Sequence, residues 1–125
     1  MNALTLAYIG DTVYDLYIRT YLAEKHGVSV HALHLAAAKY VCAAGQAAAY
    51  RTVAPLLTEE EGDAFRRGRN AHSGTTPKNA SVADYRVATG LEALFGYLYL
   101  SGDDERMSEL MAHILADGAE VGEAD

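Results

Sequence analysis

Apolar side chains recur at helical spacing along almost the whole chain. Residues 6–21 carry leucine, isoleucine and valine at intervals of three and four, with tyrosines filling much of the remainder. Similar spacing appears in the alanine-rich residues 30–54, in residues 84–101 and in residues 104–117. No stretch alternates apolar and polar residues over the length of a strand. The pattern predicts an all-α fold of about five to seven helices in one domain over residues 1–125.

Glycine and proline mark where the first helices end. The first helix is expected over residues 3–25, because Gly27 follows it and glycine is common just past a helix C-terminus. Residues 30–54 form either one long helix or two helices broken near residues 43–45. Pro55 ends this segment, since proline cannot continue the hydrogen-bond ladder.

A capping pattern marks the start of the next helix. Thr58 and Glu61 have the spacing of a capping box, and the helix is expected to reach about Arg69. We interpret the three glutamates at its beginning as a solvated helix start that complements the dipole. The last helix is expected to end at Gly118, which leaves residues 119–125 as a frayed, acidic tail.

Two of the most apolar helices each contain an acid near the middle. Asp11 lies in the first helix, with Asp15 one turn later on the same side, and Glu92 lies in residues 84–101. We expect Asp11 and Glu92 to be buried, and buried acids need a partner. Gly10 and Gly96 stand close by and suggest that another backbone approaches. A helix cap or an arginine partner for Asp11 is an equally good interpretation.

Composition narrows the class of protein. The chain has 125 residues, enough for one domain with a real core. No apolar run approaches the ~20 residues of a membrane span, and we see no secretory signal. The single cysteine, Cys42, excludes an internal disulfide, and we expect it to be a small core residue. These features favour a cytoplasmic protein with no membrane segment.

The net charge of −7 argues against a nucleic-acid partner, but the distribution of charge reverses this impression. Residues 66–86 hold five of the ten basic residues and one acid, whereas the rest of the chain holds five basic and sixteen acidic residues. Residues 70–82 (NAHSGTTPKNASV) have the composition of a long loop and offer hydroxyl and amide groups suited to phosphates and ribose hydroxyls. We call residues 66–86 the basic arm. A merely solubilising loop is the alternative.

Paired acids next to such an arm suggest a specific chemistry. If the two helices pack together, Asp11 and Glu92 face each other, and they repel unless a proton or a cation lies between them. A small number of oxygen ligands with room for water suits Mg²⁺, with Mn²⁺ as a possible substitute. A divalent cation beside a basic arm points to phosphodiester substrates.

The motifs that carry these residues resemble Mini-ribonuclease III, the ribonuclease III relative without a double-stranded RNA-binding domain. In order along the chain they are LAYIGDTVYDLYIR, RGRNA, SGTTPKN, YR and TGLEALFGYLYL. The resemblance covers nearly the whole chain. It implies an all-α endonuclease domain, a homodimer, Mg²⁺-dependent cleavage of double-stranded RNA, and a role in maturing large-subunit (23S) ribosomal RNA precursors.

The resemblance also implies which residues act. Asp11 matches the catalytic, metal-bound acid of the family's Leu-Gly-Asp signature, and Glu92 matches the metal-ligand glutamate of its last motif. Both are therefore expected to be catalytic residues and metal ligands. Asp15 could contact the ion through a water molecule, or could be a surface or interface acid.

The chain departs from full-length ribonuclease III at the remaining acids. Leu4 and Ala7 occupy the places of two glutamates, and Thr89 occupies the place of an aspartate. Residues 43–45, where the family has an acid in its middle helix, contain none. Fewer carboxylates favour one firmly held Mg²⁺ completed by waters or RNA phosphate.

The expected reaction is hydrolysis by a Mg²⁺-activated water, with 5′-phosphate and 3′-hydroxyl ends implied by the resemblance. The basic arm would hold duplex RNA, which is recognised mainly through its shape, phosphates and 2′-hydroxyls. A homodimer would place one acid pair at each strand, and the tyrosine-rich first helix is the candidate interface. The residues predicted to bind RNA are Arg66, Arg67, Arg69, Asn70, Ser73, Thr75, Lys78, Asn79 and Arg86.

Two functions from other classes stay open. A non-catalytic, dimeric RNA-binding or scaffold protein of the same fold would fit the reduced number of acids, although retention of Asp11 and Glu92 argues against it. A metal-dependent helical phosphohydrolase acting on nucleotides is a weaker alternative. The chain lacks the His-Asp pair and the repeated Glu-x-x-Glu motifs of such enzymes.

Overall fold

A computed structural model of the chain describes residues 1–25, 27, 29–71 and 81–123. All regular structure in these residues is helical, which confirms the predicted all-α fold. Within this part of the chain no helix is long and apolar enough to cross a membrane. The helices are α1 (Ala3–Lys25), α2 (Val30–Val41), α3 (Ala43–Val53), the 3₁₀ turn η1 (Ala54–Leu56), α4 (Glu59–Asn70), α5 (Val82–Leu100) and α6 (Asp104–Glu123).

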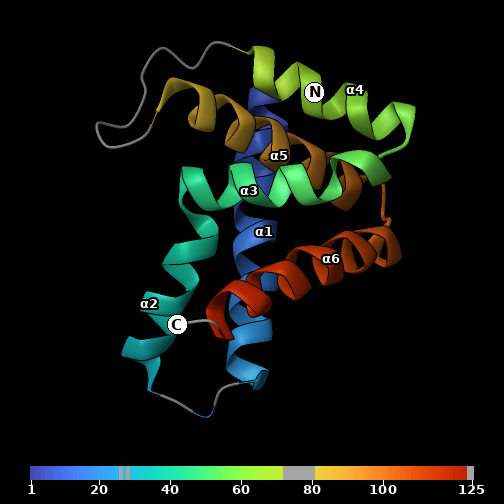
Figure 1. The fold of residues 1–125 in the computed structure, drawn as a ribbon. Helices are drawn as coiled ribbons and strands as arrows, with labels where there is room; N and C mark the ends of the chain where they lie inside the picture. Colours follow the sequence, from blue (N-terminus) through green and yellow to red (C-terminus); the bar gives the residue numbers. More distant parts are fainter. Residues whose placement is uncertain (26, 28, 72–80, 124–125) are drawn as a thin grey trace.

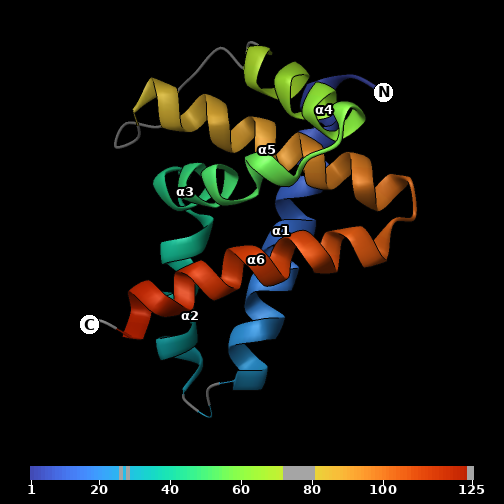
Figure 2. The same cartoon turned by 45° about the vertical axis from the view of Figure 1, so that its right-hand side comes forward.

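The long helix α1 runs through the middle of the molecule, and the other helices pack around it (Figure 1). The first half of α1 is crossed by α5. α4 and α3 pack against α5 from its two sides. The second half of α1 lies beside α2 and is crossed by α6, as the turned view also shows (Figure 2). α1 and α5 form the most extensive contact between two helices. They therefore position each other.

The core lies where α1, α5 and α6 meet. Tyr14 and Ile18 of α1 are fully buried, as are Leu94 and Phe95 of α5 and Leu110 of α6. The rings of Tyr14 and Phe95 make an edge-to-face contact with centroids 5.3 Å apart, the geometry that aromatic quadrupoles favour. Burial of side chains of this size contributes about 1.5–3 kcal/mol each and fixes how α1 and α5 cross.

The alanine-rich segment is two helices, broken at Cys42. The backbone of Cys42 is extended, and the Cys42 Sγ accepts a hydrogen bond from the N–H of Gly45 at 3.3 Å. The thiol therefore caps the start of α3. The prediction that Cys42 is a core residue is wrong, because the cap position between two helices leaves its side chain exposed.

The predicted capping box at the start of α4 is confirmed. Thr58 Oγ1 accepts from the N–H of Glu61 at 3.2 Å, and Glu61 Oε1 accepts from the N–H of Thr58 at 2.9 Å. The interpretation of this helix start as fully solvated is wrong, because Glu61 is buried. Arg106 of α6 donates to both of its carboxylate oxygens at 2.8 Å. The cap therefore also fastens α6 to α4.

The last helix is longer than predicted. α6 continues past Gly118 to Glu123 instead of ending at Gly118, and residues 119–123 are part of it. The glycine has a packing role there, since a Cβ atom on Gly118 would meet the ring of Tyr40. Residues 124–125 of the predicted tail lie outside the described residues.

Candidate active site

The site is built where α1 and α5 cross at backbone contact. A Cβ atom on Gly10 would overlap the carbonyl oxygen of Glu92, and one on Gly96 would overlap the carbonyl oxygen of Leu6. Both glycines thus allow an approach that any side chain would block. Asp11 directly follows Gly10. The close approach of the two helices therefore places the Asp11 carboxylate near Glu92 of α5.

The carboxyl group of Asp11 lies next to that of Glu92, close enough for a hydrogen bond when one of them holds a proton. Partial burial, followed by the hydrogen bond and the negative charge of Asp11, raises the pKa of Glu92 to about 8. Glu92 is half-buried, as expected for an acid in an apolar helix, but Asp11 is exposed and its predicted burial is wrong. The pair therefore has one solvated and one sheltered carboxyl group, and without a cation the sheltered one holds a proton at neutral pH.

A third side chain at this site, Gln46 of α3, was not predicted. Gln46 is 3% exposed, and its amide lies near enough to the Glu92 carboxyl to lower the pKa of that group. Its Nε2 nevertheless makes no hydrogen bond of ordinary length. The sequence contained one signal, because Gln46 is the only long polar side chain between Lys39 and Arg51 in an alanine-rich stretch.

The donor set fits a hard divalent cation that keeps most of its water. Two adjacent carboxylates repel each other, and a cation relieves this repulsion as a proton does. In the described part of the chain, no group of three or more His, Cys, Asp or Glu side chains could hold a metal ion. The positions where acids are absent agree with this, since Ala7 is buried and the Thr89 hydroxyl donates to the Tyr85 carbonyl oxygen at 3.0 Å.

Asp15, one turn beyond Asp11, is engaged elsewhere. Arg19 Nε donates to both of its carboxylate oxygens at 2.9 Å, and Arg19 Nη1 lies 3.1 Å from His34 Nδ1 of α2. This arrangement describes a surface acid that helps to join α1 to α2. A water-mediated role for Asp15 at the acid pair stays a prediction.

The basic residues of α4 gather in its last two turns. Arg66 is exposed and paired with Asp63, Arg67 is exposed, and the guanidinium of Arg69 lies 5.7 Å from the centre of the Phe65 ring. Arg69 Nε also donates to Asn70 Oδ1 at 3.3 Å. The arginines thus stand where the α4 dipole favours cations, with room to contact a polyanion.

Of the remaining predicted RNA-binding residues, the structure describes Arg86 and leaves out those within residues 72–80. Arg86 is exposed on the first turns of α5, the helix that begins shortly after residues 72–80. Because α4 packs along α5, the arginine-rich end of α4 and the start of α5 belong to one side of the molecule (Figure 1). The predicted contacts that lie outside the described residues are Ser73, Thr75, Lys78 and Asn79.

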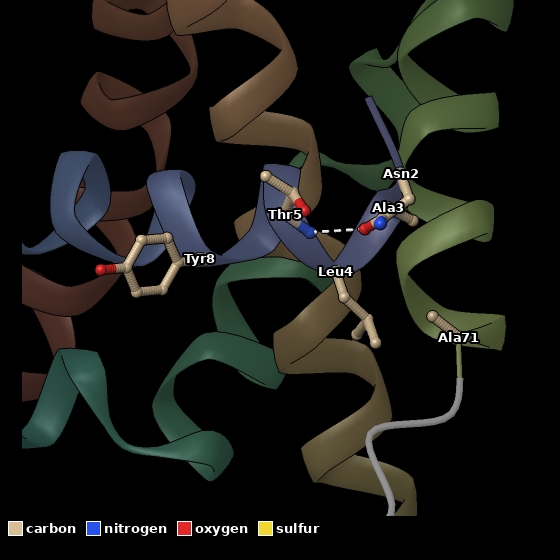
Figure 3. Close-up of a pocket in the computed structure, with 6 residues that line it drawn as sticks. All are labelled: Asn2, Ala3, Leu4, Thr5, Tyr8 and Ala71. Carbon is tan, nitrogen blue, oxygen red and sulfur yellow. Dashed lines mark hydrogen bonds between the residues drawn. The ribbon is translucent and has the colours of Figure 1, made fainter.

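The outer face of α1 carries exposed apolar side chains. Tyr8 is 80% exposed and Leu16 is 63% exposed. Leu4 and Tyr8 line a shallow hollow that also includes Ala71 at the end of α4, and Figure 3 shows Tyr8 pointing away from the helix. Within one chain, large apolar side chains of α1 therefore remain exposed to solvent. The exposed face is the one that a second copy would have to cover.

Comparison with known proteins places this geometry in a family. Residues 4–103 match the model of the ribonuclease III domain. A protein called Mini-ribonuclease 3 from Clostridium tetani is 47% identical over 116 residues, covering 92% of this chain and 77% of that protein. A protein of the same name from Symbiobacterium thermophilum is 48% identical over 120 residues, covering 96% of this chain and 92% of that protein.

A solved structure shares this fold. The crystal structure of a protein from Fusobacterium nucleatum superposes with a TM-score of 0.85 at 27% identity, covering 94% of this chain and 93% of that one. The assignment to a family rests on the domain match and on the curated relatives. The chain belongs to the ribonuclease III domain family of endoribonucleases, within the group of Mini-ribonuclease 3 proteins.

Proposed function

We propose that this protein is a Mg²⁺-dependent endoribonuclease that cleaves double-stranded RNA, with Asp11 and Glu92 as its catalytic residues and metal ligands. The observation that carries the proposal is the contact between these two carboxyl groups at the α1–α5 crossing. Two ionised carboxylates at this distance repel each other unless a cation or a proton lies between them, and the glycines at the crossing allow the close approach. The whole chain acts as one catalytic domain.

The two carboxylates have different tasks because their surroundings differ. Asp11 is exposed and reaches the side from which a phosphodiester would approach, whereas Glu92 is held in place by its half-buried position. When bound, Mg²⁺ would supply an activated water and stabilise charge on the scissile phosphate, and Mn²⁺ could substitute for it. Products with 5′-phosphate and 3′-hydroxyl ends are proposed on the strength of the family resemblance.

The basic arm is proposed to hold the RNA duplex. The exposed arginines of α4 and Arg86 can neutralise phosphates, and residues 72–80 carry Lys78 and several hydroxyl and amide groups. Such contacts depend on backbone shape and charge more than on base sequence. We propose a ribosomal RNA precursor of the large (23S) subunit as the natural substrate, processed in the cytoplasm.

A homodimer is part of the proposal. The exposed face of α1 begins one turn before Asp11 with Tyr8 and continues to Leu16 beyond it. A second copy covering this face would remove large apolar side chains from water and would bring two acid pairs to one duplex. Each pair would then cut one strand.

The rival proposal is a scaffold protein that binds RNA without cutting it. A scaffold protein would have no use for the acid pair. The α1–α5 crossing nevertheless places the carboxyl groups of Asp11 and Glu92 next to each other. A nucleotide phosphohydrolase is disfavoured because the exposed arginines suit an extended polyanion better than one small substrate.

A cleavage assay tests the proposal. Duplex RNA containing a stem of a large-subunit ribosomal precursor is incubated with the wild-type protein, with Asp11→Asn and with Glu92→Gln, in Mg²⁺, in Mn²⁺ or in EDTA. Discrete cleavage by the wild type alone, lost in EDTA, is the expected result. Binding without cleavage in both metals would move the protein to the scaffold class. Asp15→Asn tests the neighbouring acid, which is one turn away and paired with Arg19. Full cleavage would make Asp15 a surface acid, and a partial loss would support its predicted water-mediated role.

A further inference from the structure

Gln46 holds an unusual position in the core. Among the described residues, its Nε2 and the hydroxyl of Tyr14 are the buried side-chain polar atoms that lack a hydrogen bond. An unpaired buried polar group costs about 1–3 kcal/mol, so a glutamine is a poor choice for filling space between alanines. Neighbouring Ala47 and Ala49 are buried and apolar, as that helix face requires. The amide is therefore expected to gain a partner in another state of the protein.

The Glu92 carboxyl is the partner within reach. α3 packs against α5, and the buried Gln46 amide lies beside the Glu92 carboxyl, where its unpartnered Nε2 can donate a hydrogen bond. Asp11 approaches the same carboxyl from α1. Two helices thus approach Glu92 of α5: α1 brings the carboxylate of Asp11, and α3 brings the neutral amide of Gln46.

We propose that Gln46 is a positioning residue for Glu92, whose Nε2 donates a hydrogen bond to one oxygen of the ionised Glu92 carboxylate and turns the other oxygen toward Asp11. The inference rests on the proposed function, because it assumes that Asp11 and Glu92 share a divalent cation. A carboxylate oxygen that accepts from an amide is held in one orientation and stays a good ligand with its other oxygen. Partners of this kind typically change metal affinity by about 10- to 100-fold.

The first test needs no variant of Gln46, because the chain contains only this one glutamine. Selective ¹⁵N labelling of the glutamine side-chain amide therefore gives a single pair of NMR signals. Titration with MgCl₂ in the absence of RNA is expected to shift this pair and to slow the exchange of its protons with water. Asp11→Asn should show no such change. An unshifted pair in a wild-type protein that binds Mg²⁺ by calorimetry would overturn the inference.

The second test removes the donor and keeps the volume. Gln46→Met should bind Mg²⁺ about 10- to 100-fold more weakly by calorimetry, and it should melt no lower than the wild type because an unpaired amide is gone. Tyr14→Phe is the matched control, since it removes the other buried, unpartnered polar atom and should leave Mg²⁺ affinity unchanged. If Gln46→Met does not fold, Gln46→Asn withdraws the amide by one methylene, and the same loss is expected.

The outcomes separate this inference from the proposed function. Unchanged Mg²⁺ affinity in Gln46→Met, with affinity lost in Asp11→Asn and Glu92→Gln, would overturn the role of Gln46 alone. Unchanged affinity in all three variants would overturn the acid pair as a metal site and the positioning role with it.

Discussion

Gly10 of α1 lies directly against the backbone of Glu92 on α5, so that a Cβ atom on the glycine would overlap the glutamate's carbonyl oxygen. The same atom would lie 2.7 Å from the N atom of Gly96. Asp11 is the next residue, and its distance from Glu92 is therefore set by how closely the two helix backbones meet. The spacing of the acid pair depends on a position without a side chain.

Gly10→Ala is expected to separate α1 from α5. The methyl group meets backbone atoms that cannot rotate away, so the free energy of unfolding should fall by about 3 kcal/mol, the upper end of the usual cost of overpacking. Cleavage should fall as well, because Asp11 moves with its helix. Urea denaturation and the cleavage assay measure the two effects.

Gly27→Ala is the control for that substitution. No atom lies within 4 Å of a Cβ built at Gly27, so the change in unfolding free energy should be small. A Gly10→Ala protein as stable and as active as Gly27→Ala would show that the crossing does not set the site.

Much of this fold follows from local sequence signals. Apolar periodicity together with Gly27 predicts the bounds of α1, and the capping box at Thr58 predicts the start of α4. Gly10 and Gly96 indicate a close backbone approach, and the expectation that Asp11 and Glu92 face each other depended on the two helices packing together, as they do in the structure. These features depend on residues close in the chain or on a pattern that is repeated in a family.

Other features depend on contacts that no local pattern encodes. Glu61 meets Arg106 across 45 residues, so the sequence around each residue carried no sign of the pair. Gly118 follows the rule for a helix end, but the neighbouring Tyr40 ring makes it a packing position inside α6. The exposure of Asp11 likewise depends on which helices cover α1, and periodicity alone cannot give that.

Mg²⁺ is expected to stabilise the folded protein by binding to the acid pair. A ligand that binds only the folded state adds about 2.7 kcal/mol at 100 times its Kd, which a thermal melt detects easily. The gain should be absent in Asp11→Asn and in Glu92→Gln, and it should persist in Asp15→Asn. An equal rise of the melting temperature in all four proteins would mean that Mg²⁺ binds elsewhere.

Arg67→Gln should weaken RNA binding in a salt-dependent way. Loss of one phosphate contact lowers the slope of log K against log salt by roughly one unit, and replacing Arg66 and Arg69 as well should lower it further. Arg51→Gln on α3 is the matched control, since Arg51 is exposed but outside the basic arm. Slopes measured by fluorescence anisotropy that are equal in Arg67→Gln and wild type would exclude Arg67 from the interface.

Glu61→Gln should destabilise the fold while leaving the capping box intact, because glutamine can also cap at that position. It removes the buried charged partner of Arg106 and leaves only the exposed Glu109 beside the guanidinium, and breaking a largely buried pair costs about 3 kcal/mol. Glu109→Gln is the control. Glu109 contacts the same arginine from an exposed position and should contribute at most about 0.5 kcal/mol.

The pH dependence of this pair has a definite sign. The hydrogen bond from Arg106 holds the pKa of Glu61 below its ordinary value of 4.5. An acid with a lowered pKa stabilises the fold above its unfolded pKa, and that contribution is lost as the pH falls through the folded value. The stability difference between wild type and Glu61→Gln should therefore be full at pH 7 and shrink below about pH 4.5. A difference that grows on acidification would contradict the assignment.

Leu16→Glu should convert the proposed homodimer to a monomer, because it places a charge on the exposed apolar face of α1. Leu35→Glu is the control, since Leu35 is similarly exposed at 60% but lies on α2. Analytical ultracentrifugation compares the two variants with the wild type. A wild-type protein that is monomeric at tens of micromolar, or a Leu16→Glu protein that still dimerises, would exclude this face as the interface.

The most direct test of the central claim is to measure RNA binding and single-turnover cleavage together for Asp11→Asn, at protein concentrations that saturate the duplex. The carboxamide cannot act as an anionic ligand, yet it leaves the basic arm and the fold unchanged. We predict a dissociation constant close to that of the wild type and a cleavage rate reduced by at least about 100-fold. Cleavage of the bound duplex at the wild-type rate would contradict the assignment of Asp11 and Glu92 as the catalytic pair.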